Sequence, residues 1–198
     1  MKLLATCLLL GGLASPTMAG TWNLDNSHSA IRFKVRHLMI SNVGGEFKDY
    51  KVTFTTDEND KPTSIEAAIE AKSINTSNEK RDEHLRNADF FEVEKHPQIT
   101  FKSKKITGNK KGSYKITGDL TLRGITKEVT LDGTLSQAIK DPFGLNRRAL
   151  SAKTKINRKD FAMAWNKTMD SGGVVVSDAV DIDVELELTE AKAQEKNG

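Results

Sequence analysis

The sequence predicts an all-β protein built as a closed antiparallel barrel of about eight strands. Apolar and polar residues alternate along most of the chain, a pattern typical of strands with one buried and one solvated face. Turn-forming runs such as NDKP, TGNKKG and KDPFG separate the alternating stretches. Many stretches exceed the roughly five or six residues usual for a strand. A barrel of this size can be filled by side chains or hold one small ligand. A two-sheet sandwich would show the same alternation and stays open as the alternative.

The strands follow from the alternation in chain order. The expected strands cover residues 29–37, 44–56, 64–72, 98–107, 113–124, 125–135, 150–156 and 180–188. The last is the most regular, because its apolar residues from Val180 to Leu188 alternate with Asp and Glu. The second strand changes parity between Phe47 and Tyr50, and the fourth changes between Phe101 and Ile106. Each change indicates a β-bulge.

One segment, RDEHLRNADFF at 81–91 with the residues before it, predicts a short helix. TSNE at 76–79 fits a capping box, with Thr76 as the N-cap and Glu79 as the third helical residue. Asp82 and Arg86 have the spacing of a helical ion pair. We expect the charged side of this helix to face water and its few apolar residues to pack over the barrel.

The first 19 residues differ from the rest. Lys2 precedes an apolar run, LLATCLLLGGLA, that is too short to span a bilayer. Thr17 and Ala19 then fit a cleavage site after Ala19, so residues 1–19 read as a secretory signal peptide and we expect a periplasmic protein. The single cysteine, Cys7, lies in this leader, so the expected barrel domain, residues 20–190, has no thiolate or disulfide. Residues 191–198 are a polar tail.

The composition gives little support to nucleic-acid binding or to catalysis. The chain has 30 Lys and Arg against 27 Asp and Glu, too small an excess to indicate a nucleic-acid partner. Asp82, Glu83 and His84 are adjacent and would point in three directions on a helix, and no second histidine lies four residues away. We therefore expect no enzyme and no metal site. A hydrolase or metal enzyme that uses His84 and its acidic neighbours is the less favoured alternative.

A lysine-rich stretch, KSKKITGNKKG at 102–112, falls at an expected hairpin tip. A solvated turn is the simpler interpretation. The functional interpretation is a weak, transient contact with an anionic membrane surface. Arg147 and Arg148 would add to this patch if the fold brought them near.

Four stretches together resemble the YceI-like family of exported bacterial proteins. They are DNSHSAIRFKVRHLMISNVGGEF, NEKRDEHLRNADFFEVEKHPQITF, GDLTLRGITKEVTL and INRKDFAMAW, and the resemblance runs from about Thr21 to Leu188. It implies an elongated lipocalin-like barrel that carries a long apolar chain, such as a polyisoprenoid or a quinone tail. It implies no catalysis and no cofactor other than such a bound isoprenoid lipid or quinone.

The resemblance also implies an apolar lumen as the ligand-binding site. The expected lining residues are Ile31, Phe33, Val35, Phe47, Ile65, Ile69, Leu85, Phe90, Phe91, Phe101, Leu120, Leu122, Val129, Leu131, Phe161, Trp165, Ile182, Val184 and Leu186. The alternative function is a barrel without ligand that acts as a stress or protein-interaction module. A short helix with so few apolar anchors is also a candidate gate to the lumen.

Overall fold

The computed structural model describes residues 20–109, 112–170 and 172–191. The expected signal peptide lies outside the described residues, as does the expected polar tail except for Ala191.

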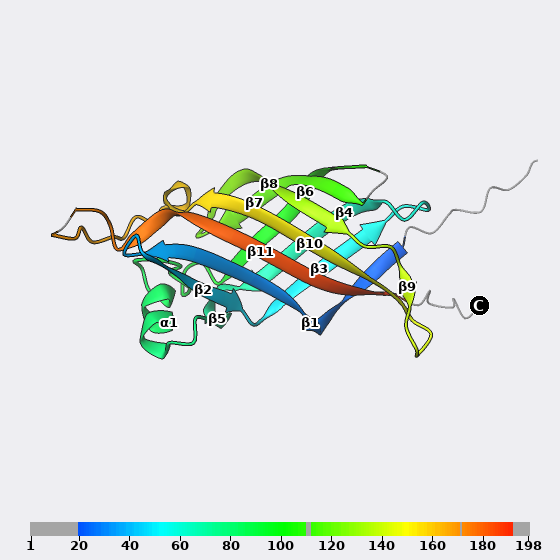
Figure 1. Cartoon of the computed structure of the whole chain (residues 1–198), viewed down its shortest axis with the longest axis horizontal. Helices are drawn as coiled ribbons and strands as arrows, with labels where there is room; N and C mark the ends of the chain where they lie inside the picture. The colour runs from blue at the N-terminus through cyan, green and yellow to red at the C-terminus, as the bar shows by residue number, and fades with distance from the viewer. Residues whose placement is uncertain (1–19, 110–111, 171, 192–198) are drawn as a thin grey trace, which may run out of the picture.

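Eleven strands form one sheet, and eight of them close into an elongated antiparallel barrel (Figure 1). The barrel strands are β1 (Gly20–His37), β3 (Tyr50–Thr56), β4 (Pro62–Glu70), β6 (Gln98–Gly108), β7 (Ser113–Leu122), β8 (Ile125–Leu135), β10 (Asn146–Asn157) and β11 (Val176–Glu190). Pairing runs β11-β10-β8-β7-β6-β4-β3-β1, and β11 pairs with β1 to close the ring. The predicted barrel is confirmed, and the sandwich alternative is wrong.

β1 changes partner midway along its length. Residues 20–22 pair with β3, whereas residues 31–37 pair with the short strand β2 (Ser41–Phe47). Between these halves, residues 26–29 bulge away from β11. Ser29 holds the bulge: its hydroxyl donates to the carbonyl of Asp25 at 2.7 Å and accepts the backbone N–H of Glu187 at 2.9 Å. Ser27, His28 and Ser29 therefore form a structural bulge in the strand.

One of the two predicted bulges is wrong and the other is confirmed. β2 ends at Phe47 and β3 begins at Tyr50, so the parity change there is a turn between two strands. The hydroxyl of Ser73, in the 3-10 helix η1 (Ala71–Ser73), accepts both backbone N–H groups of that turn. In β6 the register shifts between Ser103 and Lys105, as predicted.

The single α-helix, α1 (Glu79–Arg86), follows the two-residue strand β5 (Ile74–Asn75). Its N-cap is Asn78, whose side chain accepts the backbone N–H of Arg81 at 3.0 Å, so the predicted cap at Thr76 is wrong. The predicted Asp82–Arg86 ion pair is also wrong. Asp82 is buried, and Arg86 donates to the carbonyl oxygens of Lys72 and Ile74. The helix is thereby tied to the barrel end by its charged side chains.

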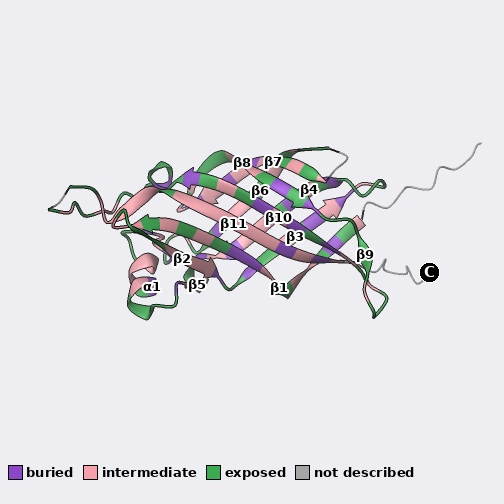
Figure 2. Cartoon of the chain, viewed as in Figure 1, coloured by how far each residue is buried: buried purple, intermediate pink, exposed green. Residues whose placement is uncertain are grey.

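Two further short elements lie on either side of β10: β9 (Ile139–Lys140), which pairs with it, and the 3-10 helix η2 (Arg158–Phe161). They mark the two ends of the barrel. β9 lies at the right end in Figure 1, and α1 lies at the left end. Along strands such as β7, β8 and β10 the exposure alternates between more buried and more exposed residues, whereas β11 is half-buried along most of its length (Figure 2).

Candidate functional site

The barrel encloses an elongated cavity of about 340 Å³. Every barrel strand contributes inward side chains to it, and these are nearly all Val, Ile, Leu, Phe or Ala. The long strands and their strict period of two produce this lining, because every second side chain must point into the lumen. The cavity can therefore take a long apolar molecule and offers little hydrogen bonding along its length.

The structure places all the predicted lining residues around this cavity except Phe161. Phe161 belongs to η2, is 1% exposed, and packs in the hydrophobic core, so its assignment to the lumen is wrong. Several lining residues were missed, among them Val43, Val52, Ala67, Ile99, Ile116, Leu150, Ala152, Ile156 and Val180. Most of these occupy inward positions of strands whose other residues were predicted, so the alternation itself could have identified them.

One end of the cavity is closed by a packed plug, which we call the closed end. Trp22 is 3% exposed, and its indole N–H donates to the hydroxyl of Thr56 at 3.2 Å. The guanidinium of Arg148 lies 4.9 Å from the centre of the indole ring. Phe54 and Leu188 pack beside them with no exposed surface. Burial lowers the pKa of Arg148 below its usual value, although the group remains a cation.

The other end, which we call the mouth, is covered by aromatic side chains from two segments. His84 and Phe90 come from α1 and the chain after it, and Trp165 comes from the connection between β10 and β11. The His84 ring meets Phe90 and Trp165 edge-on, with centroid distances of 5.1 and 5.0 Å, and Phe90 and Trp165 lie 5.3 Å apart. His84 Nε2 also lies 2.8 Å from the carboxylate of Asp89. All three rings line the cavity.

A buried polar bracket positions α1 at the mouth. The carboxylate of Asp82 accepts from the backbone N–H of Thr76 at 2.9 Å and from its hydroxyl at 2.5 Å. Arg81 donates from Nε to the Thr76 hydroxyl at 2.7 Å and from Nη2 to the Thr76 carbonyl at 2.8 Å. Thr76 and Arg81 both line the cavity. The charged segment at residues 81–91 is therefore partly buried. The expectation that its charged side faces water is wrong for Asp82.

On the opposite side of the mouth, Arg158 holds the segment that carries Trp165. Arg158 is 3% exposed and donates to the backbone carbonyls of Met163, Trp165, Val176 and Ser177. These bonds tie the start of the β10–β11 connection to the start of β11. Burial lowers the pKa of Arg158 from its usual value. The role of this arginine is to hold the Trp165 segment in place.

The acids and histidine of the alternative enzyme hypothesis do not converge on one point. Asp82 is bound to Thr76, His84 is bound to Asp89, and Glu83 is exposed. The one pair of titratable side chains in this group is His84 with Asp89, and the Asp82 carboxylate is directed to Thr76 instead. The geometry gives the His84 cluster a structural role at the mouth.

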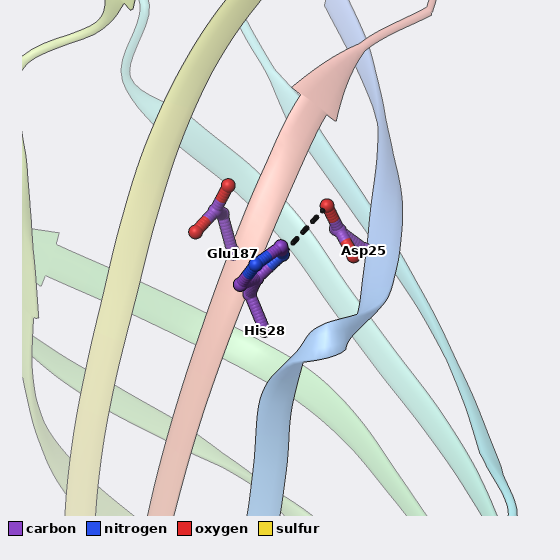
Figure 3. A group of neighbouring side chains, drawn as sticks. All are labelled: Asp25, His28 and Glu187. Atoms are coloured by element: carbon purple, nitrogen blue, oxygen red, sulfur yellow. Dashed lines mark hydrogen bonds and ion pairs between the residues drawn. The ribbon is translucent and has the colours of Figure 1, made fainter.

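A different group, Asp25, His28 and Glu187, does come together on the outer surface near the β1 bulge (Figure 3). Their ligating atoms lie within 4.8 Å of one another. Arg147 explains this proximity, because its Nη1 lies 2.8 Å from the Asp25 carboxylate and 2.6 Å from that of Glu187. Its Nε donates to Asp141 at 2.7 Å. Arg147 therefore holds three carboxylates, those of Asp25, Asp141 and Glu187, in one ion-pair network.

The same network shifts the pKa values of its members. The hydrogen bond from Arg147 lowers the pKa of Asp25 to about 2, and that from His28 adds to the effect. Arg147 likewise lowers the pKa of Asp141, and the three carboxylates raise the pKa of Arg147. Arg147 is paired with three carboxylates and Arg148 is buried against Trp22, so neither adds an unpaired exposed charge to the lysines of residues 102–112.

The lysine-rich hairpin lies at the closed end. The carbonyl of Gly112 accepts the backbone N–H of Leu135, which belongs to the closed-end core, and Figure 1 shows this end of β6 and β7 far from α1. Lys110 and Lys111 lie outside the described residues. Lys104 pairs with Asp119 and Glu128, and Lys115 pairs with Asp132. These ion pairs reduce the net charge that the hairpin presents. Within the described part of the chain, no helix has the length and apolar character needed to cross a membrane.

Comparison with known proteins agrees with this geometry. The model of the YceI-like domain matches residues 22–188. A UPF0312 protein of Staphylococcus aureus (strain N315) is 35% identical over 170 residues, which cover 85% of this chain and 96% of the relative. A crystal structure of the Campylobacter jejuni YceI protein has a TM-score of 0.70 and 34% identity, and covers 79% of this chain and 90% of that one.

Two more distant structures share the fold. Burkholderia cenocepacia BcnA has a TM-score of 0.72 at 22% identity, covering 83% of this chain and 99% of that chain. A polyisoprenoid-binding domain from Saccharophagus degradans, implicated in plant cell wall breakdown, has a TM-score of 0.62 at 15% identity, covering 86% and 98%. The four motifs, the closed barrel and the match over almost the whole described chain together show that this chain belongs to the YceI-like family.

Proposed function

We propose that this protein is an exported, periplasmic carrier that binds a polyisoprenoid or a similar long-chain lipid in the barrel cavity, without catalysis. The observation that carries the proposal is the shape and chemistry of the cavity, which is long, apolar and closed at one end. Its volume of about 340 Å³ lies within the range of about 300–1,000 Å³ typical of small-molecule sites. The polyisoprenoid binding of the Saccharophagus degradans domain, which has the same fold, adds support.

The apolar lining is sufficient to hold such a ligand. Each methylene transferred from water into an apolar site contributes about 0.8 kcal/mol. About ten buried methylenes would therefore contribute about 8 kcal/mol before the cost of association is subtracted. Because one methylene changes the affinity so little, we expect discrimination by chain type and by overall length, with the plug at Trp22 setting the length limit.

The polar groups of the cavity define how the ligand lies. Thr76, Arg81 and His84 line the mouth, whereas the wall between the mouth and Trp22 is apolar except where Arg32 and Thr154 contribute to it. Nε and Nη2 of Arg81 donate to Thr76, whereas Nη1 makes no hydrogen bond to the described residues. We propose that the apolar tail points to the closed end and that an oxygen of the head group, such as a quinone carbonyl, accepts from Arg81.

The alternative is a filled barrel that acts only as a stress or interaction module. The volume of the cavity argues against a filled barrel, because a barrel stabilised solely by its own core packs without voids of this size. The carrier hypothesis explains why Phe33, Phe101 and Val184 remain half-buried in the interior of the barrel.

Mass spectrometry of an organic extract from natively purified, exported protein tests the proposal. We expect a long-chain lipid at about one molecule per barrel, and its loss in the Ile182→Asp variant, which places a carboxylate in the apolar wall. An empty wild-type extract, together with no uptake of an added polyprenol or quinone, would refute the carrier function. Fractionation of cells that express the full chain tests export, which is refuted if the protein stays in the cytoplasm with residues 1–19 attached.

A further inference from the structure

The turn between β1 and β2, residues 38–40, which we call the mouth turn, exposes apolar side chains directly beside the cavity. Ile40 is 76% exposed and Met39 is 52% exposed. The turn follows His37, which lines the cavity, and the backbone N–H of Leu38 donates to the carbonyl of Val175, another lining residue, at 2.8 Å. In Figure 1 this turn lies at the same end as α1 and the β10–β11 connection.

The backbone of the mouth turn is unfavourable for the residues it carries. Leu38 has φ of 48° and Met39 has φ of 62°, so two consecutive side-chain-bearing residues are in the left-handed region. A β-turn with positive φ at both central residues favours Asn-Gly or Asp-Gly there, because a Cβ is strained in that conformation. The other described non-glycine residues with positive φ are Asp60, Ser77, Glu92, Arg123 and Ala162, none of which is a large apolar residue.

The turn is nevertheless well fixed. The backbone N–H of Ile40 donates to the carbonyl of His37 at 3.1 Å, and Nε of Arg36 donates to the carbonyl of Met39 at 3.2 Å. Across from it, a methyl group built on Gly173 would lie 3.7 Å from Cγ of Met39 and 3.2 Å from Cε of Met169. Met39 and Met169 thus both lie beside Gly173, and Met39 and Ile40 form an exposed apolar tip on a defined backbone.

We infer that the mouth turn is a membrane-docking element that inserts Met39 and Ile40 into the bilayer surface and brings the mouth to the lipid from which the ligand enters. The inference rests on the proposed carrier function. Strained backbone combined with exposed apolar side chains points to a function outside folding. The occupant follows from position, because the tip adjoins the opening through which an apolar ligand, insoluble in water, must pass. A bilayer surface accepts such side chains among its head groups.

The closed end provides the comparison that makes this inference testable. Phe143 and Ile139 are 87% and 65% exposed there, as much apolar surface as the mouth turn offers. Their turn has ordinary chemistry, because φ of 85° falls on Gly144 and Asp141 accepts the backbone N–H groups of Phe143 and Leu145. No strain is associated with presenting Phe143, and no cavity opening lies beside it.

Flotation with vesicles of phosphatidylethanolamine and phosphatidylglycerol tests the inference on the full mature chain. The mouth variant combines Leu38→Asn, Met39→Gly and Ile40→Thr, and the matched control combines Ile139→Thr with Phe143→Ser at the closed end. We expect the mouth variant to lose vesicle association by about tenfold or more, while the control floats like wild type. The mouth variant should fold at least as stably as wild type, since Asn-Gly suits its backbone.

Two further measurements separate this inference from the carrier proposal. Equilibrium binding of a polyprenol in detergent solution should be the same in the mouth variant and wild type, whereas the rate of polyprenol uptake from vesicles should fall with flotation. Equal flotation of the mouth variant and wild type, or an equal loss in the control, would overturn the docking inference and leave the carrier function standing. Wild-type protein that binds no polyprenol would refute the carrier function whatever the flotation shows. A mouth variant that instead loses self-association would assign the turn to a second copy of the chain and also overturn the inference.

Discussion

The two ends of this barrel contain similar residue types, but one end is packed shut and the other leads into the cavity. At the closed end, Trp22, Phe54 and Leu188 are buried at 3% exposure or less, and the one charged group among them, Arg148, packs against the indole. At the mouth, Trp165 and Leu85 are half-buried and His84 and Arg81 line the cavity. Aromatic and cationic side chains thus complete a core at one end and leave a lined opening at the other.

Stability and function depend on different parts of the molecule. Closed-end residues are held by strands paired on both sides, so their contacts are lost only when the barrel unfolds. Mouth residues lie on one short helix and on connections, which are attached by a few hydrogen bonds that Arg86 and Arg158 donate and Asp82 accepts. Segments with few apolar anchors open at lower free energy than core strands. We therefore predict that the mouth opens at a lower free energy than the rest of the barrel.

The largest expected difference is in stability between the two tryptophans. Trp22→Ala should lower the free energy of unfolding by about 3–5 kcal/mol, because it leaves a cavity in the plug and removes the partner of Arg148. Trp165→Ala should cost only about 1 kcal/mol, since the side chain is half-buried and its main loss is ring contacts. Urea unfolding of both variants measures this. Similar losses for the two tryptophans would mean that the mouth is part of the cooperative core.

The wall between the ends can be tested with two adjacent alanines on β4. Ala67 points into the cavity, and Ala68 points outward on the same strand. Ala67→Phe should reduce polyprenol affinity by about a hundredfold, or about 2.7 kcal/mol, by filling the lumen. Ala68→Phe should leave affinity unchanged. Titration with a fluorescent polyprenol measures both, and equal affinity in the two variants would show that the ligand does not occupy this part of the barrel.

The sequence predicted the walls of the cavity better than its ends, for a physical reason. A strand has period two, so Phe33, Leu120 and Ile182 could be assigned to the inside from alternation and resemblance alone. Phe161 was misassigned because it lies in a 3-10 helix, where no such period applies. The plug was not predicted, because Arg148 meets Trp22 only through closure of the whole sheet.

The mouth was predicted in part. The sequence predicts the helix at RDEHLR correctly. It predicts Thr76 as the N-cap because Ser or Thr followed three residues later by Glu is the usual pattern of a capping box. In the structure the Thr76 hydroxyl is already engaged by Asp82 and Arg81, and Asn78 caps the helix instead. Spacing identifies which groups can meet, whereas it does not say which of several acceptors a donor will choose.

The bracket that holds α1 gives a smaller and more local prediction. Asp82→Ala removes the acceptor of the Thr76 N–H and hydroxyl, and should cost about 1–3 kcal/mol. We expect the loss to appear mainly as faster hydrogen exchange in residues 76–93 and faster ligand exchange. Glu83→Ala, an exposed neighbour, is the control. Hydrogen exchange that rises equally throughout the barrel strands would show that α1 is not an independently opening segment.

The smallest effect concerns the outer ion-pair network near the β1 bulge. The pKa of Asp25 is lowered to about 2 from 3.8, so the folded state favours the charged form. The associated stability is fully present above about pH 4 and is lost as the pH falls through about 2. A shift of this size corresponds to about 2 kcal/mol at most, because Asp25 retains some contact with solvent.

Asp25→Asn should remove that acid sensitivity. The variant should be less stable than wild type at pH 7, and the difference should shrink as the pH approaches 2, where wild-type Asp25 becomes protonated. Unfolding free energies at pH 7, 4 and 2 measure it, with Asp183→Asn, a half-buried outward acid of β11 that pairs with Lys153, as the control. If the Asn variant kept a constant difference from wild type at all three pH values, the contribution of Asp25 would be steric. Because this network ties β1 to β11 away from the mouth, ligand exchange should not change with it, which distinguishes the seam that closes the barrel from the end that opens.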